Sequence, residues 1–129
     1  MSRNKLHHDE EGASTIEMAI ALPVLFLFIY GLFQMGLLFE ANAGMQHALG
    51  EASRYASIYP TPSDANLQAR ITSKLFGTSN GTFSTPTIST DTTAKTKVIR
   101  LIYSQPLNFL IVPGPTVTLT RSKTVYYAT

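Results

Sequence analysis

The chain has 129 residues and a formal net charge of +2, with ten Lys and Arg side chains against eight Asp and Glu. It contains no cysteine, which excludes disulfides and thiolate metal sites. The basic residues are scattered along the sequence rather than clustered, so the charge pattern does not favour nucleic-acid binding. This length suffices for one small domain plus one long hydrophobic segment.

The first segment, Met1–Gly12, is polar and charged and has no apolar periodicity. We therefore expect it to be disordered. His7 and His8 lie next to each other in this segment. Two such side chains without a third ligand nearby do not predict a metal site. We expect no metal and no cofactor.

The next segment, Met18–Phe39, contains no charged side chain. As a helix it would be about 33 Å long, which matches a hydrocarbon core of roughly 30 Å. It is longer than the apolar region of a signal peptide, and no small-residue cleavage motif ends it. We predict a transmembrane helix over 13–39. Gln34 is the strongly polar side chain within Met18–Phe39, and we expect neighbouring helices to satisfy its amide.

Apolar residues beyond this segment recur every three or four positions, at Met45, Leu49, Ala52, Ala56 and Tyr59. This spacing places them on one face of an amphipathic helix. The first proline after them is Pro60, and a residue before proline is biased away from helical geometry. We predict that the helix continues over 40–59, as one helix from about Ala13 to Tyr59.

A second, short helix is predicted over 62–76. Thr61 is placed to cap its first turn, Pro62 suits the first helical position, and Gly77 suits the C-terminal cap. Its apolar residues share one face, at Leu67, Ile71 and Leu75. We expect this face to pack on the apolar stripe of the first helix.

The remainder predicts a small antiparallel sheet over 97–127. Residues 77–96 read as a loop with a short strand near 83–88, and Lys97–Tyr103 reads as a strand. Gln105–Pro115 holds three prolines and an apolar patch, Phe109–Val112, so we expect no regular central strand throughout it. Residues 116–127 alternate with period two, which predicts a strand. The fold class is α+β: a long N-terminal helix, a second short helix and a small sheet, with a head over 40–129.

No catalytic site is predicted. His47 is the only histidine beyond the first twelve residues. A nucleophile, a base and an orienting group cannot be assembled at plausible positions. The phosphate-binding and dinucleotide-binding glycine motifs are absent. The sequence therefore does not indicate an enzyme.

The segment before the apolar run holds a second pattern, because Gly12 precedes Glu17 by five residues. Ser14-Thr-Ile-Glu17 fits a capping box, in which the two side chains satisfy the first amides of a helix. That explanation accounts for Glu17. It accounts neither for Gly12 nor for the hydrophilic segment that precedes it.

The combination resembles a type IV prepilin leader, and more narrowly the TadE-like family of pilus-assembly pseudopilins. Three stretches carry the resemblance: Gly12-Ala-Ser-Thr-Ile-Glu-Met-Ala-Ile-Ala-Leu-Pro23, Gly31-Leu-Phe-Gln-Met-Gly36, and Ala48 through Glu51-Ala-Ser-Arg-Tyr-Ala56. Together they cover about residues 10–60. The C-terminal strands resemble the family only loosely.

The resemblance implies a pilin-like head and a prepilin leader over 1–12, cut between Gly12 and Ala13 by a prepilin peptidase. It implies that Glu17 pairs with the freed N-terminal ammonium of another subunit and sets the register of assembly. The implied role is that of a minor pilin or pseudopilin of the Tad (tight adherence, Flp, type IVb) pilus, in pilus biogenesis, adhesion and biofilm formation. The implied partners are the peptidase, other pilins and pseudopilins, the inner-membrane assembly platform and membrane lipid, with no nucleic acid.

Charge asymmetry predicts the orientation. Arg3 and Lys5 precede the apolar run, whereas the first basic residue after it is Arg54. This bias favours a cytoplasmic N-terminus and a periplasmic head at a bacterial inner membrane, or in the extracellular pilus after assembly. The alternative is an unprocessed single-span protein whose exported head binds an envelope partner. In that case Ser14 and Glu17 form only a helix cap.

Overall fold

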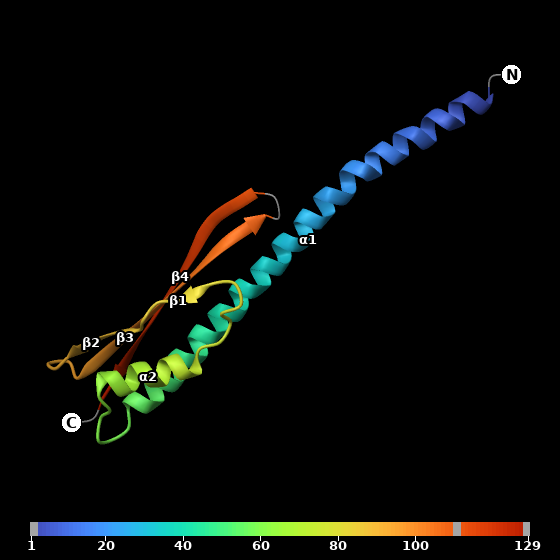
Figure 1. Ribbon diagram of the computed structural model, residues 1–129. Coiled ribbons are helices and arrows are strands. Elements are labelled where there is room, and N and C mark those ends of the chain that lie inside the picture. The colour runs from blue at the N-terminus through green and yellow to red at the C-terminus, as the bar shows by residue number, and fades with distance from the viewer. Residues whose placement is uncertain (1–2, 110–111, 128–129) are drawn as a thin grey trace.

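The computed structural model describes residues 3–109 and 112–127, with side chains described from Gly12 onward. The chain forms two helices, α1 (Arg3–Ala56) and α2 (Asp64–Lys74), followed by four strands. The strands are β1 (Thr82–Phe83), β2 (Thr87–Asp91), β3 (Thr96–Phe109) and β4 (Val112–Tyr126). A long helix, a short helix and a small antiparallel sheet confirm the predicted α+β class (Figure 1).

The helix α1 is longer at its start and shorter at its end than predicted. It begins at Arg3, so the expectation of a disordered segment is wrong for residues 3–12. No proline interrupts these residues, and helix-favouring side chains such as Lys5, Leu6 and Glu10 allow the helix to extend through them. At the other end α1 stops at Ala56, and Tyr59 is 74% exposed instead of completing the apolar stripe.

The second helix also differs in its caps. Ser63, not Thr61, is the N-cap, and its hydroxyl accepts a hydrogen bond from the Asn66 amide at 3.3 Å. The C-cap is Leu75, two residues before the predicted Gly77. The prediction of the buried face holds, because Leu67 and Ile71 are fully buried between α2 and the stripe of α1.

The sheet is built on one long hairpin. β3 pairs with β4 from Thr96 to Phe109 along one edge. Along its other edge, β2 pairs with Thr96–Arg100 and β1 pairs with Tyr103 and Ser104. The segment 77–96, predicted as a loop with one short strand, therefore holds two strands. β4 has no described strand on its outer edge.

The proline-rich stretch is part of this hairpin. Both strands run through it, with a register irregularity between Pro106 and Asn108. Here β3 has passed the end of β1, so its other edge pairs with no described strand and a proline costs no ladder hydrogen bond there. The stretch is thus not a regular central strand, as expected. Two residues of its apolar patch, Leu110 and Ile111, lie outside the described residues.

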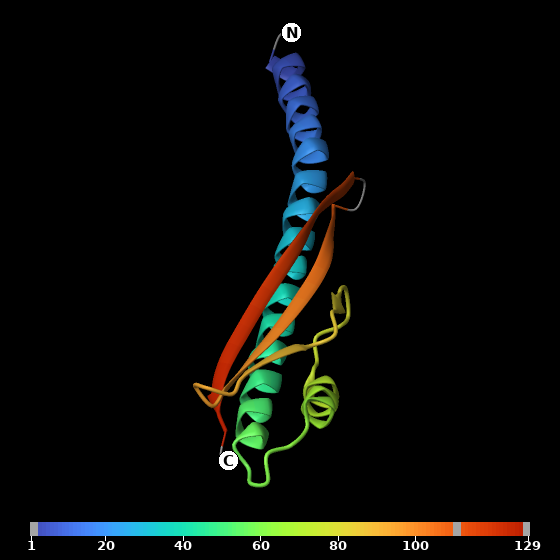
Figure 2. The same ribbon diagram turned by 90° about the vertical axis from the view of Figure 1, so that its left-hand side faces the viewer.

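The two helices cover one face of the sheet. Alternate residues of β3 point toward them and are buried, namely Lys97, Ile99, Leu101, Tyr103 and Gln105. The core joins these to the α1 stripe, in which Met45, Ala48 and Ala52 are fully buried. Figure 2 shows the hairpin crossing obliquely over the C-terminal half of α1. The head therefore packs against only the C-terminal half of α1.

Close backbone packing fixes the loop after α2 against α1. A methyl group on Gly44 would come within 2.3 Å of the Phe76 carbonyl oxygen. Gly77 has φ +81°, and a methyl group there would come within 2.7 Å of the Ala41 backbone. Only glycine meets both requirements, a left-handed backbone at Gly77 and contact at Gly44. This contact ties α2 to the centre of the long helix.

Candidate processing and assembly site

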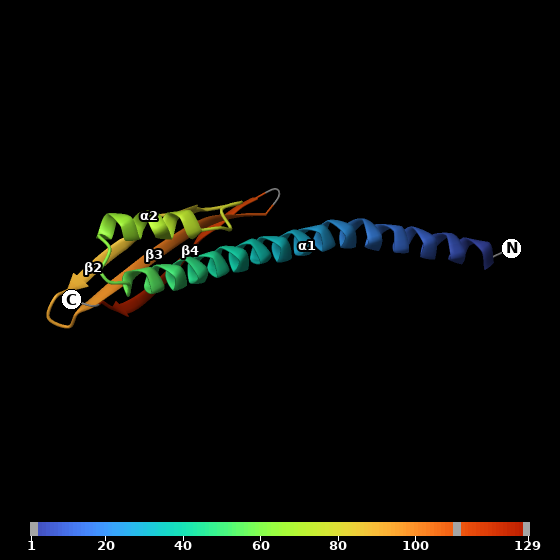
Figure 3. The same cartoon turned by 90° about the horizontal axis from the view of Figure 1, so that it is seen from below.

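The predicted cut site lies in the first third of α1, and the N-terminal part of this helix extends away from the head (Figure 3). Gly12 and Ala13 are exposed. A methyl group added at Gly12 would meet no atom within 4 Å. A glycine inside a helix costs about 1 kcal/mol relative to alanine. Gly12 therefore weakens the helix where an enzyme would need extended backbone, and no packing requires glycine there.

Glu17 lies about one and a half turns beyond Gly12 and is exposed. Among the side chains that the structure describes, none forms an ion pair with it. The apolar run begins at the next residue, Met18. A carboxylate at the edge of an apolar segment is costly in lipid unless a cation compensates it. The described side chains therefore do not neutralise this carboxylate.

The capping-box explanation of Glu17 is wrong for the uncut chain. Because α1 begins at Arg3, Ser14 is an interior helical residue and not an N-cap. The amides that Ser14 and Glu17 would satisfy already lie within the helix. A cut after Gly12 would remove this upstream part, and the same two residues would then lie in the first turn of a new helix terminus.

Between Glu17 and the head, α1 carries an apolar surface that nothing in the described chain covers. Its most apolar window has none of its residues buried. The large exposed side chains are Ile20, Leu22, Val24, Leu25, Phe26, Leu27, Phe28, Ile29, Leu32 and Phe33. In the described residues this is the one helix long and apolar enough to cross a membrane. A helix in the core of a soluble domain would be buried, and this one is not.

The part of α1 that the head covers begins at Gln34, six residues before the predicted start of the head at residue 40. Gln34 is 2% exposed, and the end of the hairpin satisfies its amide. Its Nε2 donates to the carbonyl of Asn108, and its Oε1 accepts from the Asn108 amide at 3.1 Å. The Gln105 amide donates to the Gln34 carbonyl at 3.4 Å. The expectation that neighbouring helices satisfy Gln34 is wrong, since this chain does so itself.

Sequence reasoning missed this contact, which we call the Gln34 lock: Gln34, Gln105 and Asn108. The residues Gln34 and Asn108 are 74 positions apart. Nothing in the local pattern of either segment signals the other. The one available signal was an amide side chain within an apolar run, because a buried polar group requires a partner.

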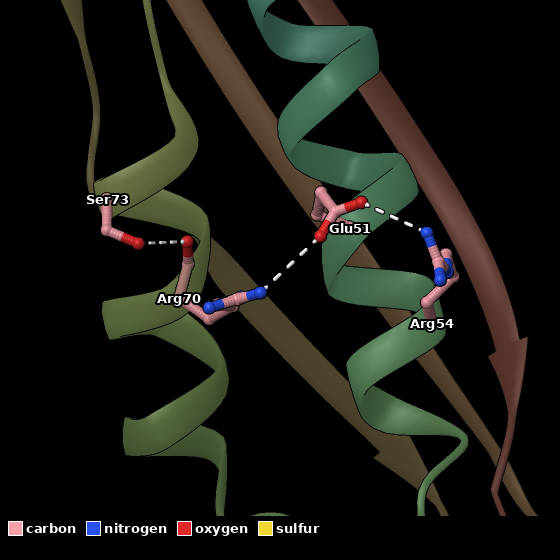
Figure 4. A network of polar contacts seen from close by, with 4 residues as sticks. All are labelled: Glu51, Arg54, Arg70 and Ser73. Carbon is pink, nitrogen blue, oxygen red and sulfur yellow. Dashed lines mark hydrogen bonds and ion pairs between the residues drawn. The ribbon is translucent and has the colours of Figure 1, made fainter.

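At the far end of α1 a polar network joins the two helices (Figure 4). Glu51 pairs with Arg70 of α2 at 3.5 Å and with Arg54 at 3.4 Å. Arg70 also lies over the Tyr55 ring, 5.9 Å from its centroid. All these groups are partly exposed, so the pairs contribute little to stability. The network positions α2 against α1.

A second ion pair, between β3 and α2, is less exposed to solvent than the pairs of Glu51. The Lys97 ammonium, on the helix-facing side of β3, pairs with the Asp64 carboxylate at the start of α2. The Lys97 side chain is almost fully buried.

In the described residues, no group of three His, Asp or Glu side chains could hold a metal ion. These polar contacts join elements of the fold.

One known family is similar to part of this chain. The model of the family described as TadE-like protein matches residues 12–54. Residues 12–54 are thus similar to this family. The match starts at the predicted cut site and ends near the end of α1, so the resemblance is confirmed over about a third of the chain. No curated protein and no solved structure matches the chain.

The TadE-like family is one of structural and assembly proteins rather than enzymes. The uncovered apolar helix fits a membrane-anchored pilus protein. The match includes the uncovered half of α1 and the stripe that the head covers, and it excludes α2 and the sheet.

Proposed function

We propose that the chain is a minor pilin or pseudopilin of a Tad pilus machine, made as a precursor and cut between Gly12 and Ala13 by a prepilin peptidase. One observation carries the proposal. From Met18 to Phe33 the helix is apolar and has no buried residue in the described chain, while from Gln34 the same helix is covered by a compact head. An anchor of this kind suits lipid before assembly and the helices of other subunits afterwards.

Glu17 would act in assembly. Cutting after Gly12 creates an ammonium group at Ala13, and an adjacent subunit's ammonium can pair with the Glu17 carboxylate. An unpaired charge in apolar surroundings is strongly unfavourable. Subunit registers that leave the carboxylate or the ammonium unpaired would therefore be disfavoured. The cut also exposes new helix-terminal amides, which Ser14 and Glu17 are placed to satisfy. Both roles depend on the same cut.

The proposed location follows from the charges. Arg3 and Lys5 favour a cytoplasmic leader, so the head lies in the periplasm and the helix crosses the inner membrane. The partners are then the prepilin peptidase, other pilins and pseudopilins of the Tad system, the assembly platform and lipid. Adhesion and biofilm formation would be consequences of the assembled pilus.

The mass of the mature protein tests the cut. Produced with the peptidase, the chain should lose the residues before Ala13, as measured by intact mass spectrometry. Gly12→Leu should retain the full mass, because a bulky side chain blocks access to the backbone. Gly36→Leu is the matched control, since Gly36 likewise has no atom within 4 Å of an added methyl, and it should be cut normally. A mature N-terminus other than Ala13 would contradict the proposal, and an uncut chain would support the single-span alternative.

The role of Glu17 has a separate test. Glu17→Ala should leave membrane insertion unchanged and reduce the amount of protein recovered in sheared pili. Glu40→Ala is the control, because Glu40 is also an exposed carboxylate on α1. Equal recovery of the two variants in pili would remove Glu17 from assembly.

A further inference from the structure

We propose that the end of the β3–β4 hairpin lies in the membrane–water interface on the head's side of the inner membrane, with Leu107 and Phe109 against lipid acyl chains. In this position the hairpin end sets how deeply α1 is inserted in the bilayer. This proposal rests on the membrane anchor of the proposed function. It assigns a lipid-contacting role to a part of the head that the TadE-like match does not include.

Charge is divided sharply along the hairpin. From Leu101 to Thr120 the sequence contains no Asp, Glu, Lys or Arg. The charged residues of the hairpin gather in its other half, at Lys95, Lys97, Arg100, Arg121 and Lys123. Because Arg121 pairs with Leu101 across the two strands, the charge-free parts of β3 and β4 form one continuous end of the hairpin.

The charge boundary of α1 lies at the same level as that of the hairpin. The apolar run of α1 ends at Phe39, and Glu40 is the next residue. Arg121, the first charge of β4, donates from Nε to the side-chain oxygen of Asn42 at 2.9 Å. One plane near Glu40 and Arg121 therefore separates a charged region from a charge-free region in both elements. A membrane surface is such a plane.

The position of the Gln34 lock sets how far the hairpin passes that plane. Gln34 lies six residues before Glu40, which is about 9 Å along a helix. The polar interface on each side of a bilayer is about 5–8 Å thick. The hairpin end thus reaches the boundary between headgroups and acyl chains. Figures 1 and 2 show the adjoining ends of β3 and β4 beside the middle part of α1.

The lock also removes the main cost of this position. Backbone N–H and C=O groups in lipid must be satisfied within the protein. The Asn108 amide and carbonyl both bond to the Gln34 side chain. The Gln34 amide, itself costly within an apolar helix, is satisfied by the same bonds. The helix and the hairpin each supply the polar partner that the other needs at this depth.

The surface left at this position is apolar. Between α1 and the hairpin end lies a groove of about 360 Å³, walled by Phe28, Leu32 and Met35 on the helix and by Leu107 and Phe109 on the hairpin. Phe109 is 40% exposed. Gln34 also lines the groove, with its side chain bonded to Asn108, and the other lining side chains adjoin the exposed apolar surface of the helix. We assign the groove to lipid acyl chains, because the same surroundings must cover the helix beside it.

Single tryptophan reporters test the proposal, because the chain has no tryptophan of its own. The full chain carrying Phe109→Trp is reconstituted in phosphatidylethanolamine–phosphatidylglycerol vesicles, with or without brominated acyl chains. We expect brominated lipid to quench most of its emission and aqueous iodide to quench little. Tyr126→Trp, at the other end of β4 and 75% exposed, should show the reverse.

Two further reporters make the outcomes distinct. Phe28→Trp lies in the proposed span and should be quenched by brominated lipid; an unquenched Phe28→Trp would overturn the anchor and this proposal together. If Phe28→Trp is quenched while Phe109→Trp behaves like Tyr126→Trp, the anchor stands and the hairpin proposal fails. Emission at Phe109→Trp that is shielded from both quenchers would indicate a second copy or another protein in the groove, and would also overturn it. Thr116→Trp, exposed opposite Pro106, repeats the test if Phe109→Trp does not fold.

Discussion

The fold makes the Tyr103 phenol harder to ionise. Its ring is fully buried against Phe83, with centroids 4.8 Å apart, and its hydroxyl donates to the Gln105 side chain at 3.0 Å. Burial raises the pKa of the Tyr103 phenol above its usual value near 10, and the Glu40 carboxylate acts in the same direction. The phenol is therefore held neutral within the head.

This shift predicts a loss of stability in alkali. The folded-state pKa of Tyr103 is raised, so its contribution is complete below pH 10 and is lost as the pH rises through the folded-state pKa, because the unfolded chain ionises first. Urea unfolding between pH 9 and pH 11 should show this fall, and Tyr103→Phe should make it shallower. Tyr126→Phe, at an exposed site, should leave the fall unchanged. Equal slopes for wild type and Tyr103→Phe would contradict the assignment.

Among the elements, α1 and the β3–β4 hairpin depend on each other through the Gln34 lock. Cutting Gln34 back to alanine would leave the Asn108 N–H and C=O without their partner. An unsatisfied buried polar group costs about 1–3 kcal/mol. The loss falls on the hairpin end, since the rest of the hairpin keeps its pairing with the core.

We therefore predict that Gln34→Ala opens the hairpin end locally. Hydrogen exchange at the Asn108 amide should accelerate by about tenfold for each 1.4 kcal/mol lost, while exchange at buried core amides such as that of Leu101 changes little. Gln46→Ala removes an exposed glutamine of the same helix and is the control. Unchanged protection at Asn108 would show that the lock does not hold the hairpin.

The architecture was predictable from the sequence where a local period carries the information. Met45, Leu49, Ala52 and Ala56 recur at helical spacing and are all in the core. The hairpin was harder, because its prolines oppose a strand locally and only pairing with β4 maintains it. At the site, Gly12 and Glu17 follow from spacing and resemblance and remain predictions. The Gln34 lock joins distant segments, and no local pattern contains it.

For the whole molecule, the core and the membrane-competent surface are separate. All core residues lie between Leu38 and Val125, and most of the uncovered apolar surface of α1 lies before Gln34. Removing the uncovered helix should therefore subtract exposed apolar area without creating a cavity. The head should not need the anchor in order to fold.

Two truncations test this separation. A fragment of residues 34–129 should be soluble without detergent and unfold cooperatively, as measured by gel filtration and circular dichroism. A fragment of residues 42–129 should be markedly less stable, because it lacks the buried side chains of Gln34, Leu38 and Ala41. Aggregation of the longer fragment, or equal stability of the two, would show that the head and the anchor are not independent.

The way the hairpin is fastened also determines how the molecule would carry load. β3 and β4 lie obliquely along α1, and their end is tied to the helix at Gln34 (Figure 2). Antiparallel ladder bonds run perpendicular to their strands. Tension along α1 would therefore act nearly perpendicular to these bonds and would not peel the strands apart one pair at a time. Through the Gln34 lock, β3 would share tension along the covered part of α1.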